Sequence, residues 1–307
     1  MAKTRREFMV SLGSALAAPA IVTARPATKR YPIGFSTLGC PKWDWKTILD
    51  NAVKWGYASI ELRGLQGEMD LPKRPEFSAS GVKQSLKDLQ ALDLRVSDLG
   101  ASTNLHVPEA AARQKQLDEG KRFIDLARQL QSPYVRVFGD KWVESEPHEK
   151  TIERIVLGLR ELGAHAKGSG VGVIIETHGD FTESATIAEM VTKAGLPEVA
   201  VLWDTHHTCV AGKEQPADTY KTIGAKVRHV HIKDSVPSGS EVRYVLPGQG
   251  KLPLREIVRV LAANKYKGFY GLEWEKAWHP EIEDPEVAFP HYAKVMTEYL
   301  KEAGVAP

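Results

Sequence analysis

The sequence is poor in cysteine and has no long apolar run. Only Cys40 and Cys209 occur in 307 residues, and two cysteines do not make the disulfide framework of a small secreted protein. We expect both to be free. The apolar segment at residues 10–22 is too short to span a bilayer in a mature protein. A disulfide scaffold and a membrane-spanning protein are therefore both disfavoured.

An excess of positive charge is also absent. The chain has 41 Lys and Arg against 39 Asp and Glu, and loss of residues 1–24 would remove three basic residues and one acidic residue, leaving 38 of each. Proteins that bind phosphate backbones use clusters of Lys and Arg. Since neither the net charge nor any run of residues supplies such a cluster, a nucleic-acid substrate is disfavoured.

The N-terminus has the pattern of an export signal. TRREFMV (4–10) precedes the mildly apolar VSLGSALAAPAIV (10–22) and a small-residue cleavage site, which is typical of a twin-arginine signal peptide. We expect residues 1–24 to be this signal, residues 25–32 a linker, and residues 33–304 the mature domain. The signal predicts a periplasmic or otherwise exported protein.

Short apolar segments alternate with helical patterns through the rest of the chain. A helix is expected after Asp44, a last helix opens at Asp284-Pro285, and a long Gly/Pro loop precedes the helix at 254–264. This alternation predicts an α/β fold, a (β/α)8 TIM barrel in a single domain. The eight predicted strands are 33–39, 59–64, 95–102, 134–139, 172–177, 199–204, 227–232 and 269–274.

Four of these strands end in metal-binding side chains, namely Glu176, Asp204, His231 and Glu273. In a (β/α)8 barrel the carboxyl ends of the strands meet at one face, where catalytic residues lie. Buried carboxylates are costly without a cation to compensate them. We therefore predict one divalent metal ion held by these four residues. Three carboxylates and one imidazole favour Mn²⁺, with Mg²⁺, Co²⁺ or Zn²⁺ as alternatives.

Neighbouring residues leave alternatives open. Side chains in a strand alternate with period two, so His229 shares a face with His231 but lies one layer deeper, as a core histidine would. Glu275 could replace Glu273 in the metal site, although the register after the strand glycine favours Glu273. Glu61, in the second strand, is either a core hydrogen-bond partner or a substrate contact.

With these motifs the chain resembles the xylose isomerase-like TIM barrel superfamily. The resembling branch contains the ketose 3-epimerases, hydroxypyruvate isomerases and inosose dehydratases, and the resemblance covers about residues 33–300. It rests on VIIETHG in the fifth strand, on the Asp-x-x-His of DTHH, and on a His-x-His followed by PGQG (247–250). The last motif is YKGFYGLE in the eighth strand.

The resemblance implies a metal-dependent isomerase or epimerase, or a lyase, that acts on a keto-sugar or related polyol through an enediolate. Glu176 and Glu273 would be both metal ligands and the acid/base pair, and such catalysis is worth about 10²–10⁴-fold. Dimers and tetramers are usual in the resembling families. The candidate substrate-binding residues are His207, Arg243, His178 and His106.

Two other functions remain open at this point. A type IV apurinic endonuclease of the same superfamily shares several of the motifs, but it adds an Asp-x-His where this chain has Val242-Arg243-Tyr244. Export and the lack of net charge also argue against a DNA substrate. A non-catalytic barrel that uses a metal only to hold a sugar is the other alternative.

Overall fold

Eight parallel strands close into a barrel in the order β1-β10-β7-β6-β5-β4-β3-β2. The computed structural model describes residues 29–307, so the signal peptide predicted at residues 1–24 lies outside the described part of the chain. The barrel strands are β1 (Ile33–Ser36), β2 (Ser59–Leu62), β3 (Arg95–Asn104), β4 (Tyr134–Phe138), β5 (Gly172–Glu176), β6 (Val199–Asp204), β7 (Val227–Ile232) and β10 (Tyr270–Leu272).

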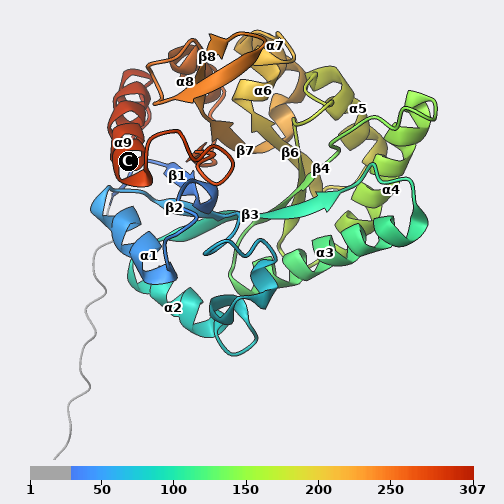
Figure 1. Ribbon diagram of the computed structural model, residues 1–307, viewed down its shortest axis with the longest axis horizontal. Coiled ribbons are helices and arrows are strands. Elements are labelled where there is room, and N and C mark those ends of the chain that lie inside the picture. Colours follow the sequence, from blue (N-terminus) through green and yellow to red (C-terminus); the bar gives the residue numbers. More distant parts are fainter. Residues whose placement is uncertain (1–28) are drawn as a thin grey trace, which may run out of the picture.

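Helices surround the barrel and form its outer ring (Figure 1). The strand-helix alternation and the pairing of β1 with β10 confirm the predicted α/β, single-domain TIM barrel. The helices are α1 (Trp45–Lys54), α2 (Val82–Ala91), α3 (Ala110–Gln129), α4 (His148–Ala166), α5 (Ser184–Ala194), α6 (Thr205–Val210), α7 (Pro216–Ile223), α8 (Leu254–Ala263) and α9 (Pro285–Glu302).

The helix start signals in the sequence act as expected. The carboxylate of Asp44 accepts a hydrogen bond of 2.8 Å from the backbone N–H of Thr47 and so caps α1. An N-terminal N–H has no partner within its helix, and a side-chain cap supplies one. Asp284 precedes α9, whose first residue is Pro285; proline fits there because its missing N–H is not needed.

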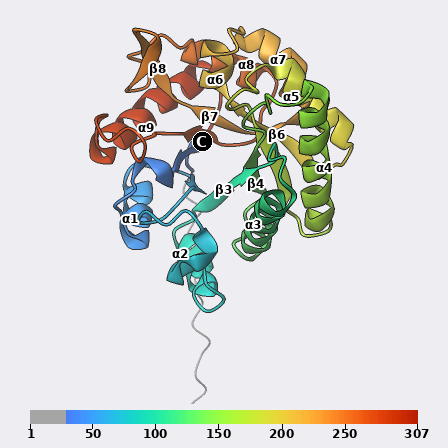
Figure 2. The ribbon, with the colours of Figure 1, turned by 45° about the vertical axis from the view of Figure 1, so that its right-hand side comes forward.

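The long loop before α8 contains a hairpin that the sequence did not predict. β8 (Asp234–Ser238) pairs antiparallel with β9 (Glu241–Val245), and the hairpin lies at the edge of the ring beside α6 (Figure 2). Pro237 lies inside β8. Because proline is rare within strands, the sequence pattern indicated a loop at this position. The buried Asp234 carboxylate accepts hydrogen bonds from the backbone N–H groups of Ser235, Gly248, Gly250 and Leu252.

The inside of the barrel is apolar in one part and charged in another. Ile174, Ala200 and Leu202 form a small apolar cluster of their own, separate from the large core between strands and helices. No helix among residues 29–307 is long and apolar enough to cross a membrane. Cys40 and Cys209 are both free. The buried charged or ionisable residues at the strand ends and in the barrel include Glu61, Arg63, Asp98, Arg136, Glu176, Asp204, His229, His231, Lys233 and Glu273.

Candidate metal centre

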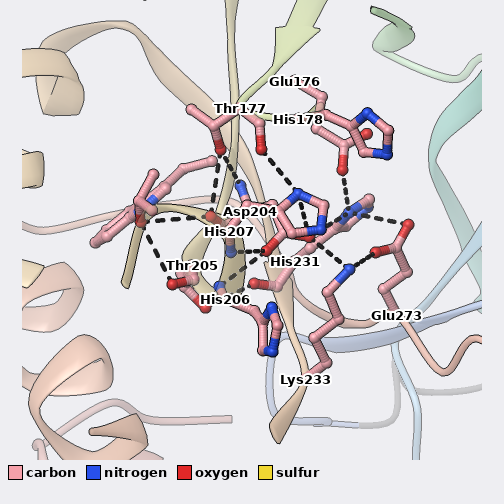
Figure 3. Close-up of polar contacts among 12 residues, drawn as sticks. Glu176, Thr177, His178, Asp204, Thr205, His206, His207, His231, Lys233 and Glu273 are labelled. Atoms are coloured by element: carbon pink, nitrogen blue, oxygen red, sulfur yellow. Dashed lines mark hydrogen bonds and ion pairs between the residues drawn. The ribbon is translucent and has the colours of Figure 1, made fainter. Parts of the chain in front are cut away.

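The ends of β5, β6, β7 and β10 bring the four predicted ligands to one point. Asp204 and His231 are register partners on neighbouring strands, and Gly271, two residues before Glu273, pairs with His231. One oxygen or nitrogen from each of Glu176, Asp204, His231 and Glu273 lies within 4.8 Å of the others. Their side chains point toward one another in Figure 3. The four residues could therefore hold a single ion, and their role as ligands remains a prediction.

Asp204 is fixed by the short helix that follows β6. Its Oδ1 accepts hydrogen bonds of 2.8 and 2.9 Å from the backbone N–H groups of His206 and His207, which makes Asp204 the N-cap of α6. Its Oδ2 faces the site, 3.8 Å from Nδ1 of His231 and 2.9 Å from Nζ of Lys233. One carboxylate oxygen thus orients the residue, and the other stays available for a ligand role.

His231 is oriented from behind by Glu61. Nε2 of His231 lies 2.7 Å from Oε2 of Glu61, whereas Nδ1 lies 3.3 Å from both Glu176 and Glu273. A carboxylate that accepts from the far nitrogen of a metal-binding histidine fixes the ring and its tautomer. Glu61 also lies 3.3 Å from Nε2 of His229. Both His229 and Glu61 are therefore buried behind the site, and of the two readings of Glu61 the contacts favour the hydrogen-bond partner.

Lys233 supplies the positive charge at the front of the site. Its Nζ lies 2.9 Å from Asp204, 2.5 Å from Glu273 and 2.6 Å from Glu275, and the side chain is 1% exposed. Burial alone would lower the pKa of Lys233, but Asp204, Glu273 and Glu275 outweigh burial and raise that pKa well above its ordinary value. Lys233 lies two residues after His231, which puts the two side chains on the same face, but no sequence motif assigned Lys233 a role.

Arg136 is the buried cation beside Glu176, as Lys233 is the buried cation beside Glu273. Nε of Arg136 lies 3.2 Å from Oε2 of Glu176, and both side chains are 1% exposed. Burial would raise the pKa of Glu176, yet His231 and Arg136 together bring it below the ordinary value. The pKa of Glu273 is lowered in the same way, since His231 and Lys233 outweigh its burial. Both glutamates are therefore ionised at neutral pH.

The donor set fits a divalent cation. Within the described residues, Glu176 Oε2 and Asp204 Oδ2 are buried. Arg136 and Lys233 lie 3.2 and 2.9 Å from them, but neither oxygen has a partner of hydrogen-bond geometry. Burial of unsatisfied carboxylate oxygens is unfavourable, and a metal ion would satisfy them. Oxygen ligands with one imidazole suit Mn²⁺, Mg²⁺, Co²⁺ or Zn²⁺. The geometry gives no preference among these ions.

His207 and His206 differ in where their rings point. Nδ1 of His207 donates to the backbone oxygen of Thr177 at 2.9 Å, and within residues 29–307 Nε2 makes no hydrogen bond. His206 instead places Nε2 2.9 Å from the hydroxyl of Ser235 in the hairpin. Burial, together with the charge of Lys233, lowers the pKa of His206 to about 3. The neutral His206 thus links α6 to the hairpin through Nε2, and its Nδ1 has no hydrogen-bond partner among the described residues.

The other three substrate-binding candidates are not members of the four-residue cluster. His178 and His106 both face Asp140, with His178 Nδ1 3.8 Å and His106 Nδ1 4.0 Å from its carboxylate. Arg243 is exposed on β9. Its neighbour Tyr244 faces the site, with its ring 5.4 Å from that of His206. Side chains alternate along a strand, so the hairpin directs Tyr244, rather than Arg243, toward the site.

The contact between Glu61 and His231 makes a prediction about metal affinity. We expect Glu61→Gln to weaken Mn²⁺ binding about 10–100-fold, because it removes the charged acceptor that orients the His231 ring. Titration of Mn²⁺ into metal-stripped protein measures this change. Asp98→Asn is the matched control, since Asp98 is equally buried and contacts His229 but not His231. An equal loss in both variants would mean that overall buried charge matters and the orientation of His231 does not.

Taken together, the closed parallel barrel and the carboxylate-rich cluster at its strand ends define a class, the (β/α)8 barrels with a candidate divalent-metal centre at the C-terminal face. The chain belongs to the xylose isomerase-like TIM barrel family, whose model matches residues 49–299. The resemblance inferred from the sequence motifs is thereby confirmed at the level of the family.

Relatives with assigned activities include an epimerase and a dehydratase. The chain is 24% identical over 249 residues to fructoselysine 3-epimerase of Shigella flexneri, which covers 78% of this chain and 88% of that enzyme. It is 30% identical over 306 residues to inosose dehydratase of Clostridium botulinum strain Alaska E43, covering 88% and 95%. The expectation that the protein is an enzyme of the isomerase, epimerase or lyase type is confirmed by these relatives.

Solved structures show the same fold. The IOLI protein with a bound zinc atom has a TM-score of 0.74 and 18% identity, over 89% of this chain and 99% of that one. D-Psicose 3-epimerase of Clostridium cellulolyticum H10, solved with D-tagatose, has a TM-score of 0.71 and 17% identity, over 87% and 98%. The fold of this chain is thus shared with a zinc-binding protein and with a sugar epimerase.

Proposed function

We propose that the protein is a divalent-metal-dependent enzyme that isomerises, epimerises or eliminates from a keto-sugar or related polyol through an enediolate. The observation that carries this proposal is the pair of buried glutamates, Glu176 and Glu273, each with an oxygen 3.3 Å from the same nitrogen of His231. A divalent ion bound to the four-residue set would polarise the keto group of the substrate. Mn²⁺ is the ion we expect, with Mg²⁺, Co²⁺ or Zn²⁺ as alternatives.

In this proposal the two glutamates move the proton. Each has its own buried cation, Arg136 beside Glu176 and Lys233 beside Glu273, so each is ionised and able to accept a proton. They come from β5 and from the end of β10, and they converge from different strands. One glutamate would remove the proton next to the carbonyl, and the other would return a proton from its own side.

The remaining polar groups would orient the substrate. His207 keeps Nε2 free for a substrate oxygen, and its ring is fixed through Thr177. The names of the relatives support a carbohydrate substrate, because an epimerase of a sugar derivative and an inosose dehydratase both act on polyhydroxylated compounds. Epimerisation, isomerisation and elimination can all start with removal of a proton next to a carbonyl, so one site can serve any of them.

The test is solvent exchange. The Mn²⁺-loaded protein is incubated in D₂O with a panel of keto-sugars and 3-keto-glycosides, and NMR follows deuterium incorporation and product. The proposal predicts exchange at the carbon next to the keto group, with about one divalent ion per chain. Three zinc ions per chain would favour the endonuclease alternative, and sugar binding without exchange would favour a non-catalytic barrel.

We also propose that the protein is exported through the twin-arginine pathway. Arg5, Arg6 and Phe8 precede the apolar segment at residues 10–22, in the order that such signals have. Replacement of both arginines by lysine should leave the full-length protein in the cytoplasm, as measured by cell fractionation and immunoblotting. Unchanged export of this variant would mean that the segment is not a twin-arginine signal.

A further inference from the structure

A third buried cation at the strand ends, Arg63, forms no close ion pair with any carboxylate of residues 29–307. Arg63 follows β2 and is 8% exposed. Its guanidinium makes one long hydrogen bond, from Nη1 to the backbone oxygen of Gly100 at 3.5 Å. Across residues 29–307, no carboxylate oxygen lies within 4.0 Å of its nitrogens. A guanidinium carries five N–H donors, so most of the donors of Arg63 are unused.

The other two cations of the site each lie within ion-pair distance of a carboxylate. Lys233 contacts three carboxylates, and Arg136 contacts Glu176. Burial, and then the repulsion of Arg136, lower the pKa of Arg63 to about 9, which still leaves it charged at neutral pH. Burying a charge without a partner is expensive. The partial burial of Arg63 is therefore incompletely compensated in the ligand-free protein.

The backbone is shaped to keep Arg63 beside Arg136. A Cβ on Gly100 would lie 2.6 Å from Cδ of Arg63 and 2.7 Å from Nη2 of Arg136. Only a residue without a side chain leaves room for both arginines at this point of β3. The N–H groups of Arg63 that make no hydrogen bond are not fully buried. They therefore remain in contact with solvent.

We propose that Arg63 binds a carboxylate of the substrate, so that the substrate is a polyhydroxylated keto acid and not a neutral keto-sugar. This inference rests on the proposed function and narrows its substrate class. A planar guanidinium with free donors matches a carboxylate through two parallel hydrogen bonds. A neutral hydroxyl could accept a hydrogen bond but would leave the charge of Arg63 uncompensated.

The surrounding acids do not exclude an anion. The carboxylates whose charges act on Arg63 are Glu273, Glu61 and Glu176. Glu61 is already paired with His231, and a divalent ion would neutralise the charge of Glu176 and Glu273. Among the described residues, Arg63 is then a cation of the metal-loaded site without a carboxylate within 4.0 Å. An acid group on the substrate would complete the site.

The experiment compares matched ligands on the Mn²⁺-loaded protein by isothermal titration calorimetry. The pairs are keto-uronates and the neutral ketoses of the same stereochemistry, such as D-fructuronate and D-fructose, with D-fructose 6-phosphate as a second anion. We expect at least one acid to bind about tenfold or more tightly than its neutral partner. Arg63→Met should remove this preference and leave binding of the neutral ketose unchanged, whereas Arg63→Lys should restore part of it.

Each control addresses a different alternative. Arg243→Met removes an exposed arginine of the hairpin and should keep the preference for the acid. Arg63→Met should unfold at the same temperature as the parent or higher, because it removes an unpaired buried charge; a purely structural arginine would lower that temperature. The inference is overturned if no acid in the panel is preferred, if the preference persists in Arg63→Met, or if the phosphate binds more tightly than every acid.

The exchange assay separates this inference from the proposed function. Binding of an acid that depends on Arg63, without deuterium exchange, would refute the enzyme mechanism and leave the anion site intact. Exchange on neutral ketoses alone would refute the anion site and leave the mechanism intact.

Discussion

Deuterium from solvent should enter the substrate about 10²–10⁴ times more slowly when either Glu176 or Glu273 is replaced by glutamine. Glutamine keeps the size of the side chain and an oxygen that can approach a metal, but it cannot accept the proton. Because each glutamate has its own cation, neither is expected to replace the other. NMR of the substrate in D₂O, with saturating Mn²⁺, measures the rate.

The same variants also alter the candidate metal site, so bound Mn²⁺ is measured in each sample. Glu275→Gln is the matched control: Glu275 contacts Lys233 at 2.6 Å but is not among the four clustered groups. We expect it to keep most of the exchange activity. Persistent exchange in both Glu176→Gln and Glu273→Gln would show that the two glutamates are not the acid/base pair.

The second large effect is expected at Lys233. Lys233→Met leaves three carboxylates without their shared cation, and removal of one partner from a buried ion pair costs about 3–5 kcal/mol. In metal-free protein we expect a loss of that size in the free energy of unfolding. Mn²⁺ should restore part of the stability, because a bound divalent ion supplies positive charge to Asp204 and Glu273. Urea unfolding with EDTA and with Mn²⁺ measures both values.

Lys46→Met is the control, because it removes a lysine that lies outside the candidate metal site. Lys46 pairs with Asp50 on the surface of α1, and the two side chains are 82% and 60% exposed. Exposed pairs of this kind contribute little to stability. If Lys233→Met is no less stable than Lys46→Met in EDTA, Lys233 does not offset the charge of the site.

The barrel and the four clustered residues could be predicted because their signals are local. An apolar run that ends in Glu176, Asp204 or His231 shows both a buried strand and a polar side chain at its end, and parallel strands must bring such ends to one face. Period-two alternation was sufficient to place His229 behind His231. The fold and the positions of these residues could therefore be predicted from the sequence, whereas the identity of the metal could not.

The rest depends on contacts between distant residues. Arg63 and Arg136 are single arginines inside apolar segments, and nothing local shows that one of them meets Glu176 while the other meets no acid. The hairpin was missed because Pro237 interrupts β8. That error also affects Arg243, because only the register of β9 shows that Tyr244 takes the side facing the site.

Gly100 can affect substrate binding although it has no side chain to contact the substrate. Its missing methyl group leaves space for Cδ of Arg63 and Nη2 of Arg136, and an added methyl group would have to displace both side chains. We then expect Gly100→Ala to fold normally but to have impaired turnover. In a mutational survey its loss of activity would be comparable to that of the glutamate variants. The loss would come from displacement of Arg63 and Arg136. Position 100 is therefore a starting point for altering the substrate preference.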